Sequence, residues 1–237
     1  DGICPDHQTK PEAVNEENYF FKLSKYQGQL LQLIENDKFQ ISPANKKAEI
    51  VSFIRSELQD FSISRSKKRA RGVGVPVPDD PDQVIYVWFD ALDIYMTGVG
   101  FGWDEKIWKK WWPADLHIIG KDINRFHTVY WPAILLSAHL PLPKQVFVHS
   151  FINVNGLKIS KSIGNIIDPR DVANEFGLEA VRYYLLSQIP TQDDGDFNNQ
   201  RFKEVYNANL ANGLGNLTAR VAKLCEQSSS QFSVNSS

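Results

Sequence analysis

The chain has little cysteine, little net charge and no long apolar run. Its two cysteines, Cys4 and Cys225, argue against a disulfide scaffold and fit a reducing, cytoplasmic compartment. A formal net charge of −2 argues against a surface that is basic all over and binds nucleic acid non-specifically, so any contact with RNA has to be local. No apolar run approaches ~18 residues and no secretory signal is present, so we expect no membrane partner.

Methionine is also scarce, because Met96 is the only one. We therefore expect that residue 1 is not a translation start and that the chain is part of a longer protein. Hydrophobic residues make up 42% of the chain and aromatic residues 12%, which is enough for a sizeable core.

Apolar runs alternate with helical patterns through residues 25–151. Continuous apolar runs of strand length predict buried parallel strands at residues 84–89, 116–119 and 146–151. Apolar residues at helical spacing predict helices at 25–35, from Pro43 to about Leu58, and at 123–138 with a break at Pro132. Residues 62–83 have the composition of a loop or an edge strand. The alternation predicts an α/β fold built on a doubly wound, Rossmann-type parallel sheet.

The C-terminal third is predicted to be helical. Asp168 can cap a first helix that ends near Gly177, and a second helix stops before Pro190. A long third helix is expected from Gln200 to about Glu226. These helices predict an α-helical bundle segment after the sheet.

Two lysines follow a predicted hairpin. Asn155-Gly156 is a strong signal for a two-residue turn, because both central residues of a type I′ turn need positive φ. The chain then presents Lys158 and Lys161 on a short polar loop, where two ammonium groups can clamp phosphates. A solvated basic turn is the other interpretation of an isolated K-x-x-K pair.

The lysine pair is not isolated. Residues 158–162, K-I-S-K-S, resemble the second signature of class I aminoacyl-tRNA synthetases, K-M-S-K-S, with Ile159 in place of methionine. Further stretches resemble the methionyl-tRNA synthetase version of that catalytic domain, in one order along the chain: 18–24 (NYFFKLS), 85–92 (IYVWFDAL), 117–127 (HIIGKDINRFH), 129–133 (VYWPA), 194–197 (DGDF) and 210–217 (LANGLGNL).

The first signature of the family, H-I-G-H, is absent. The chain therefore resembles the second half of the catalytic domain followed by the start of the anticodon-binding domain. The resemblance implies three segments: residues 1–12 as a remnant of the connective, zinc-knuckle insertion, residues 13–165 as catalytic domain, and residues 166–237 as linker helices and the first part of the helical domain.

The resemblance implies that the parent protein activates L-methionine with ATP and Mg²⁺ and transfers it to tRNA(Met). Lys161, assisted by Lys158, is expected to stabilise the phosphates during transfer. Because the H-I-G-H half is absent, we expect the isolated chain to have no measurable activity in methionine activation.

The resemblance also assigns residues to the two small substrates. The methionine side chain is expected to contact Trp88, Ala91, Leu92, Tyr95, Ile123 and His127. ATP is expected to contact Gly120, Lys121, Asp122, His149 and Ile152, together with Lys158 and Lys161. Spacing alone leaves simpler interpretations open. The first set can be aromatic residues of the core with one hydrogen-bonded histidine, and residues 120–122 can be a plain turn in which the aspartate caps a helix.

Asn212, Asn216 and Arg220 recur every four residues in the stretch that resembles the family's anticodon-contacting helix. They predict contacts with tRNA, and a solvated helix face is the alternative. The basic run at residues 65–71 can touch tRNA phosphates or be a solvated loop. Cys4 and His7, spaced C-x-x-H, can form half of a structural Zn²⁺ site in the parent protein, since a second pair of ligands is not present here.

Three alternatives remain at this stage. The chain can be a non-catalytic tRNA-binding or assembly module of the same fold. It can belong to a class I synthetase for leucine, valine or cysteine. It can also be one chain of a split enzyme whose missing N-terminal half is a separate chain.

Overall fold

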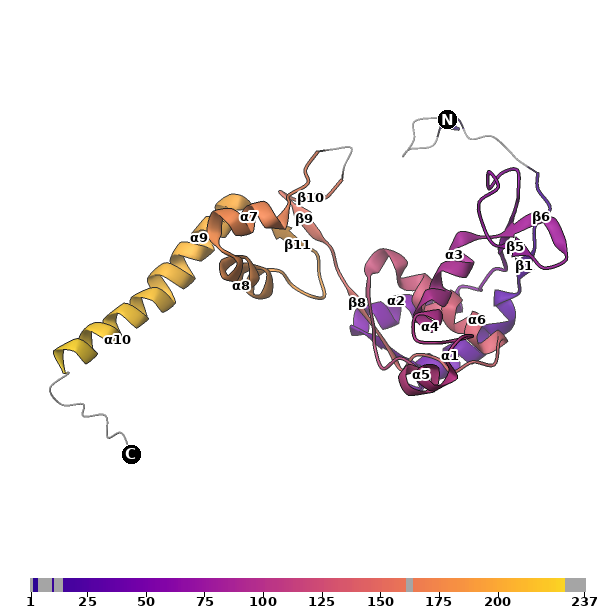
Figure 1. Cartoon of the computed structure of the whole chain (residues 1–237), viewed down its shortest axis with the longest axis horizontal. Helices are drawn as coiled ribbons and strands as arrows, with labels where there is room; N and C mark the ends of the chain where they lie inside the picture. The colour runs from indigo at the N-terminus through magenta and orange to yellow at the C-terminus, as the bar shows by residue number, and fades with distance from the viewer. Residues whose placement is uncertain (1, 4–9, 11–14, 161–163, 229–237) are drawn as a thin grey trace. The chain divides into compact units, whose positions relative to one another are not determined.

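The computed structural model describes residues 2–3, 10, 15–160 and 164–228, and it divides into two compact units, residues 1–148 and 149–237 (Figure 1). The elements of the first unit are β1 (Phe20–Phe21), η1 (Leu23–Tyr26), α1 (Gln27–Glu35), β2 (Gln40–Ser42), α2 (Ala44–Arg55), β3 (Phe61–Ser62), β4 (Ser64–Ser66), β5 (Pro76–Val77), β6 (Asp80–Ile85), α3 (Val87–Asp90), η2 (Ala91–Asp93), α4 (Ile94–Thr97), α5 (Glu105–Trp111), β7 (His117–Gly120), η3 (Lys121–Ile123), η4 (Phe126–Tyr130), α6 (Trp131–Ser137) and β8 (Gln145–His149), whose last residue opens the second unit.

The second unit continues with β9 (Ile152–Val154), β10 (Leu157–Lys158), α7 (Pro169–Phe176), α8 (Leu178–Gln188), β11 (Gly195–Phe197), α9 (Asn199–Val205), η5 (Tyr206–Gly215) and α10 (Asn216–Gln227). Within the part of the chain that the structure describes, no helix combines the length and the apolar character needed to cross a bilayer.

A three-stranded sheet with the order β2-β8-β7 forms the centre of the first unit. β2 runs parallel to β8, and Ile41 lies opposite Val146. Their side chains are buried with Ile34 of α1 and Ile54 of α2, so the helices cover this sheet through one apolar cluster. Each fully buried side chain of this size contributes about 1.5–3 kcal/mol to folding. The predicted α/β class with a parallel sheet is confirmed.

Residues 84–89 are not the predicted parallel strand. β6 ends at Ile85 and is the middle strand of a separate antiparallel sheet, β4-β6-β5, while α3 begins at Val87. Val87 is 63% exposed, so the second half of the apolar run is not covered on both faces. A short apolar run does not distinguish strand from helix by itself, and here it is divided between the two.

The predicted helix at residues 123–138 is wound in three ways. A 3₁₀ turn, η3, and a π-helix, η4, precede the α-helix α6, and Pro132 lies in the first turn of α6. Proline has no N–H to donate and its ring crowds the carbonyl four residues earlier, so a wider turn before it avoids both problems. The predicted break is therefore found as a change of winding before Pro132, and His127 lies within the π-wound turn.

The predicted hairpin is confirmed. β9 and β10 are antiparallel, with Val154 opposite Leu157. The φ values of Asn155 and Gly156 are 51° and 73°, as a type I′ turn requires. β11 adds to the other side of β9 in parallel orientation, with Phe197 opposite Val154.

The helices of the second unit also follow the prediction. The Asp168 side chain accepts a hydrogen bond from the backbone N–H of Arg170, and Gly177 has a φ of 86° where α7 ends. In Figure 1 the long C-terminal helix continues from α9 to α10 without a break in its ribbon, as expected for residues 200–226. Its middle third, η5, is π-wound, which the sequence did not predict.

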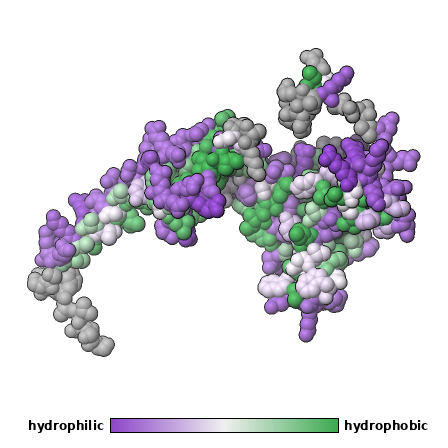
Figure 2. Space-filling model, turned by 45° about the horizontal axis from the view of Figure 1, so that its top comes forward, coloured by the Kyte–Doolittle hydropathy of each residue, from purple (hydrophilic) through white to green (hydrophobic). Residues whose placement is uncertain are grey.

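An apolar core joins the strands and helices of the second unit. Tyr184 of α8 and Phe202 of α9 are almost fully buried, and their ring centroids lie 5.0 Å apart. Phe197 of β11 packs edge-on against Tyr184. Figure 2 shows further apolar side chains at the surface around β9 and β10, where Ile152 and Ile159 border a pocket of about 270 Å³.

Candidate functional site

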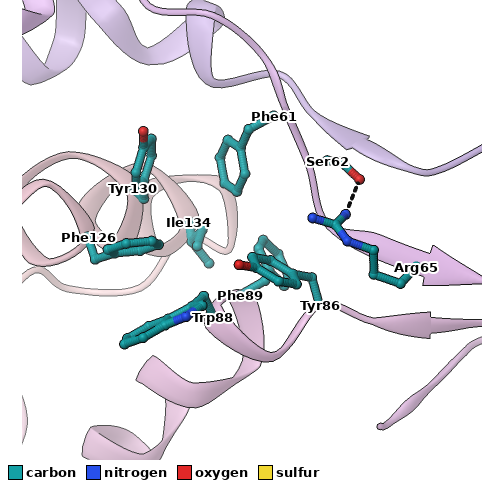
Figure 3. Close-up of a pocket in the computed structure, with 9 residues that line it drawn as sticks. All are labelled: Phe61, Ser62, Arg65, Tyr86, Trp88, Phe89, Phe126, Tyr130 and Ile134. Atoms are coloured by element: carbon teal, nitrogen blue, oxygen red, sulfur yellow. Dashed lines mark hydrogen bonds between the residues drawn. The ribbon is translucent and has the colours of Figure 1, made fainter. Parts of the chain in front are cut away.

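An aromatic pocket of about 220 Å³ lies in the first unit (Figure 3). Its lining comes from the strands β3 and β4, the start of α3, and the helices η4 and α6: Phe61, Ser62, Arg65, Tyr86, Trp88, Phe89, Phe126, Tyr130 and Ile134. The volume is below the ~300–1,000 Å³ typical of sites for drug-sized ligands, so the pocket suits a group of side-chain size. Of the six residues predicted to contact methionine, Trp88 is the one that lines it.

Trp88 stacks on Phe126, with ring centroids 4.9 Å apart and an interplanar angle of 26°. Phe126 in turn packs edge-on against Tyr130, and Phe61 lies 4.9 Å from Tyr130 between centroids. Trp88 remains 39% exposed, so one face of its ring is available to a ligand. The sequence prediction missed Phe61, Phe126 and Tyr130. Phe126 and Tyr130 are four residues apart in the predicted helix, which was a signal for a shared aromatic face.

Tyr95 and His127 form a hydrogen-bonded pair, and His127 directly follows Phe126, on which Trp88 stacks. The Tyr95 hydroxyl oxygen lies 2.9 Å from His127 Nε2, and His127 Nδ1 lies 3.0 Å from the carbonyl oxygen of Ile123. A carbonyl only accepts, so Nδ1 carries the proton and Nε2 of the neutral ring accepts from the tyrosine hydroxyl. The Tyr95 oxygen therefore directs its lone pairs, rather than its proton, away from the pair.

Burial keeps these groups uncharged. It lowers the pKa of His127, although the hydrogen bond to the Ile123 carbonyl opposes this, and it raises the pKa of Tyr95. The neighbouring His117, whose ring centroid is 4.5 Å from that of Tyr95, has its pKa lowered to about 4 by burial and by His127. At neutral pH the wall formed by these rings is polar but carries no charge, which suits a neutral thioether better than an ion.

The other predicted methionine residues have different surroundings. Leu92 is buried in a cluster with Met96, Trp112, Trp131 and Leu135, so it supports the site from the core. Ala91 is exposed on the turn η2. Ile123 is half-buried, packs against the main core of the unit, and positions His127 through its carbonyl.

Asp93 on the turn η2 has a raised pKa. Burial, and then the charge of Asp90, raises its pKa from 3.8 to about 6. The folded state therefore binds a proton more tightly than the unfolded state, so this group lowers stability as the pH rises from about 4 to above 6. Because Asp93 is only partly buried, solvent screening reduces the effect at pH 7 to about 1 kcal/mol.

We expect Asp93→Asn to raise the melting temperature by about 2–4 °C at pH 7.5 and to have no effect at pH 4. The measurement is thermal unfolding of variant and parent at both pH values. The lowered pKa of His117 gives stability that falls as the pH drops from 6.5 to about 4. Variant and parent share this contribution, so it cancels in the difference between their melting temperatures at each pH. Asp82→Asn, at an exposed position of β6, is the control, and an equal gain at pH 4 and pH 7.5 would contradict the prediction.

The residues predicted to contact ATP are divided between the two units. Gly120 ends β7, and Lys121 and Asp122 form the turn η3 directly before Ile123, so this set adjoins the methionine set in the first unit. His149 ends β8 and donates from Nδ1 to the Ser150 carbonyl, at 2.8 Å. Ile152 begins β9 in the second unit. A shared ATP site remains a prediction.

The lysine loop is braced by one side chain, Asn165, that the sequence prediction did not single out. The Asn165 side chain accepts from the backbone N–H of Ser160, at 2.8 Å, and donates to the Lys158 carbonyl, at 3.0 Å. Lys158 is exposed on β10, with its Nζ 5.3 Å from the ring centroid of Phe151. Lys161 lies outside the described residues. The Asn165 amide thus connects residue 165 to Lys158 and Ser160 on the other side of the loop.

Aspartates from the predicted D-G-D-F stretch hold the same hairpin. Asp194 accepts from the backbone N–H of Phe151, at 3.0 Å, and Asp196 accepts from the N–H of Gly156, at 2.7 Å. The stretch resembled the family at the sequence level, and the structure gives it this physical role.

The remaining predicted residues form no assembled site among the described residues. Asn212, Asn216 and Arg220 are all exposed on the long helix, and Asn212 lies in its π-wound part, so only the latter two keep α-helical spacing. Cys4 and His7 lie outside the described residues. Elsewhere in the described ranges, no group of three His, Cys, Asp or Glu side chains is placed to hold a metal ion.

Comparison with solved structures defines the class of protein. A Mycobacterium tuberculosis methionyl-tRNA synthetase in complex with methionyl-adenylate matches with a TM-score of 0.82 and 43% sequence identity, over 94% of this chain and 44% of that one. The apo form of the same protein matches with a TM-score of 0.78 and 41% identity, over 92% and 42%.

Sequence comparison defines the family. The chain belongs to the family described as tRNA synthetases class I (M), which it matches over residues 1–222. The methionine–tRNA ligase of Thermotoga maritima is 46% identical over 225 residues, which are 95% of this chain and 35% of that protein. The methionine–tRNA ligase of Brucella suis is 49% identical over 233 residues, 95% of this chain and 44% of that protein. The chain thus spans less than half the length of these relatives.

Proposed function

We propose that this chain is part of a methionine–tRNA ligase and supplies the methionine wall and the lysine loop of its active site. The parent protein activates L-methionine with ATP to form methionyl-adenylate and then transfers the methionyl group to tRNA(Met). The proposal is supported by the family match and by relatives with this activity, one of which was solved with methionyl-adenylate.

One observation in the chain itself carries the choice of methionine: the uncharged pair Tyr95–His127, whose His127 directly follows Phe126, the ring on which Trp88 stacks. A thioether packs favourably against aromatic rings, with each contact contributing about 0.3–1.5 kcal/mol. Leucine is branched and has no sulfur, so it loses these contacts. A site of this kind discriminates by about 1–3 kcal/mol for a change of one methylene, so homocysteine is the expected competitor.

In the activation step the methionine carboxylate attacks the α-phosphate of ATP and pyrophosphate leaves. No covalent enzyme intermediate is needed, so positioning and charge stabilisation supply the catalysis. Lys158 and Lys161 are proposed to stabilise the phosphates, with Mg²⁺ bound to the phosphate oxygens. Gly120, Asp122, His149 and Ile152 are proposed to hold the adenosine.

Methionine-dependent exchange of pyrophosphate into ATP tests the proposal. The assay uses a protein in which this chain is joined to an H-I-G-H-containing half from a relative. We expect exchange with methionine, and at least tenfold slower exchange with leucine, valine or cysteine at the same concentration. The 237-residue chain alone is the control and is expected to be inactive. Equal exchange with leucine, or none with any amino acid, would refute the assignment.

The non-catalytic alternative makes a different prediction, because a tRNA-binding module supports no exchange in any pairing. Zinc binding by Cys4 and His7, and anticodon contacts by Asn212, Asn216 and Arg220, remain proposals for the longer protein. So do the three segments at residues 1–12, 13–165 and 166–237.

A further inference from the structure

A cluster of cations lies on the turn that links β4 to β5. Residues 67–71, here named the basic turn, contain Lys67, Lys68, Arg69 and Arg71. Backbone hydrogen bonds fix the turn: the N–H of Lys67 donates to the Asp82 carbonyl, at 2.7 Å, and the N–H of Gly72 donates to the Lys67 carbonyl, at 2.9 Å. The cations are thus presented on an ordered backbone.

Most of these charges have no internal partner. Arg69 pairs with Glu16, with Nη1 3.1 Å from the carboxylate oxygen. Lys67, Lys68 and Arg71 are exposed and make no ion pair with any residue that the structure describes. A protein with a net charge of −2 therefore concentrates three positive charges without an ion pair among the described residues within five positions, and such a patch attracts polyanions.

An apolar groove of about 400 Å³ begins at the same turn. Its walls include Val73, Val75 and Val87, which are 77%, 48% and 63% exposed. Asp90 is the acidic side chain in its lining. Exposed valines beside a basic turn give a surface that is both apolar and electropositive, which a merely solvated loop does not need.

Arg65 and Tyr86 form the floor between the groove and the aromatic pocket, since both line each of them. The Arg65 guanidinium carbon lies 4.3 Å from the Tyr86 ring centroid, and Nη1 donates to the Ser62 hydroxyl and the Ser64 carbonyl, each at 2.7 Å. Figure 3 shows the guanidinium beside the Tyr86 ring, with Trp88 on the other side of that ring. The groove and the pocket that contains Trp88 are therefore neighbours that share these two residues as a wall.

We propose that the basic turn and this groove bind the single-stranded 3′ end of the RNA substrate on its path to the aromatic pocket. Single-stranded RNA is bound by cations that follow its phosphates and by aromatic rings or guanidinium planes on which its bases stack. Lys67, Lys68 and Arg71 supply the cations, and the Arg65–Tyr86 pair supplies the platform. The inference rests on the proposed function, because it takes tRNA as the substrate.

The test measures binding of the 237-residue chain to a fluorescent RNA hairpin with a four-nucleotide single-stranded 3′ tail, by anisotropy at ~0.1 M salt. Replacing Lys67, Lys68 and Arg71 by serine is expected to raise Kd at least tenfold. The slope of log K against log salt should fall by about 2, since each lost contact with a single strand removes ~0.7. Tyr86→Leu should weaken binding of the tailed hairpin and leave a blunt hairpin unchanged.

Serine at Lys38, Lys106 and Lys110, three exposed lysines of the same unit, is the charge-matched control and should change Kd less than twofold. Equal weakening by both triple variants, equal binding of tailed and blunt hairpins, or no binding of RNA would each overturn the proposal. Binding of an acidic peptide in preference to the tailed hairpin would also overturn it. Pyrophosphate exchange needs no RNA, so its success or failure judges the proposed function separately.

Discussion

Replacing Lys161 by alanine, in a protein that contains both class I signatures, is expected to slow methionine activation about a hundredfold. Removing one preorganised donor to a developing charge typically costs about 3 kcal/mol in the transition state. The KM for methionine should stay within twofold, because the lysine acts on the phosphates. The measurement is pyrophosphate exchange at varied methionine and ATP concentrations.

Lys158→Ala should have a smaller effect in the same assay, because this lysine is placed on the strand β10 before the loop. Lys223→Ala, at an exposed position of α10, is the matched control and should leave the rate unchanged. An unchanged rate for Lys161→Ala would remove the lysine loop from the reaction. A parallel loss in the control would show that the assay reports on stability or net charge.

Trp88→Ala is expected to raise the KM for methionine about thirtyfold. The ring stacks on Phe126 and leaves 39% of its surface exposed, so its loss removes an aromatic wall without opening the core. About 80–100 Å² of lost apolar contact corresponds to about 2 kcal/mol, which is a factor of about thirty in affinity. The rate at saturating methionine should fall much less, since the side-chain wall contributes alike to the ground state and the transition state.

Trp111→Ala is the control for this variant, because Trp111 is 58% exposed on α5 and does not line the pocket. Its KM for methionine should equal that of the parent. Steady-state kinetics of pyrophosphate exchange and a melting curve for each variant provide the comparison. If Trp88→Ala binds methionine normally, the methionine side chain does not lie on this wall, and the aromatic pocket needs another occupant.

Turns and helix ends could be predicted from the sequence because they are determined by interactions between residues close together in the chain. Asn155-Gly156 strongly favours a reversal, since few other residue pairs accept two positive φ values. Asp168 and Gly177 likewise begin and end a helix through contacts with their own backbone neighbours. The predicted strand at residues 84–89 was wrong because its cause is not local. The division of this run between β6 and α3 depends on which other segments cover each half.

Only part of the candidate site could be predicted from the sequence. Tyr95 and His127 were predicted together, and their hydrogen bond was not, since its two elements lie in separate parts of the chain. Asn165 was missed because an asparagine in a polar loop is unremarkable until its amide is seen between Ser160 and Lys158. Phe126 was missed because its role comes from Trp88, which is distant in sequence.

The sequence by itself determined which chemical groups this protein can use: two ammonium groups after a hairpin, a set of aromatic side chains and a basic turn. Hydrophobic periodicity and turn residues also determined most of its helices, because these signals act within a few residues. The tertiary structure alone decided which rings stack, which nitrogen of His127 carries the proton, and that Arg65 and Tyr86 line both the apolar groove and the aromatic pocket. Those properties depend on distances between segments, and burial and hydrogen bonding between segments are set only when the chain has folded.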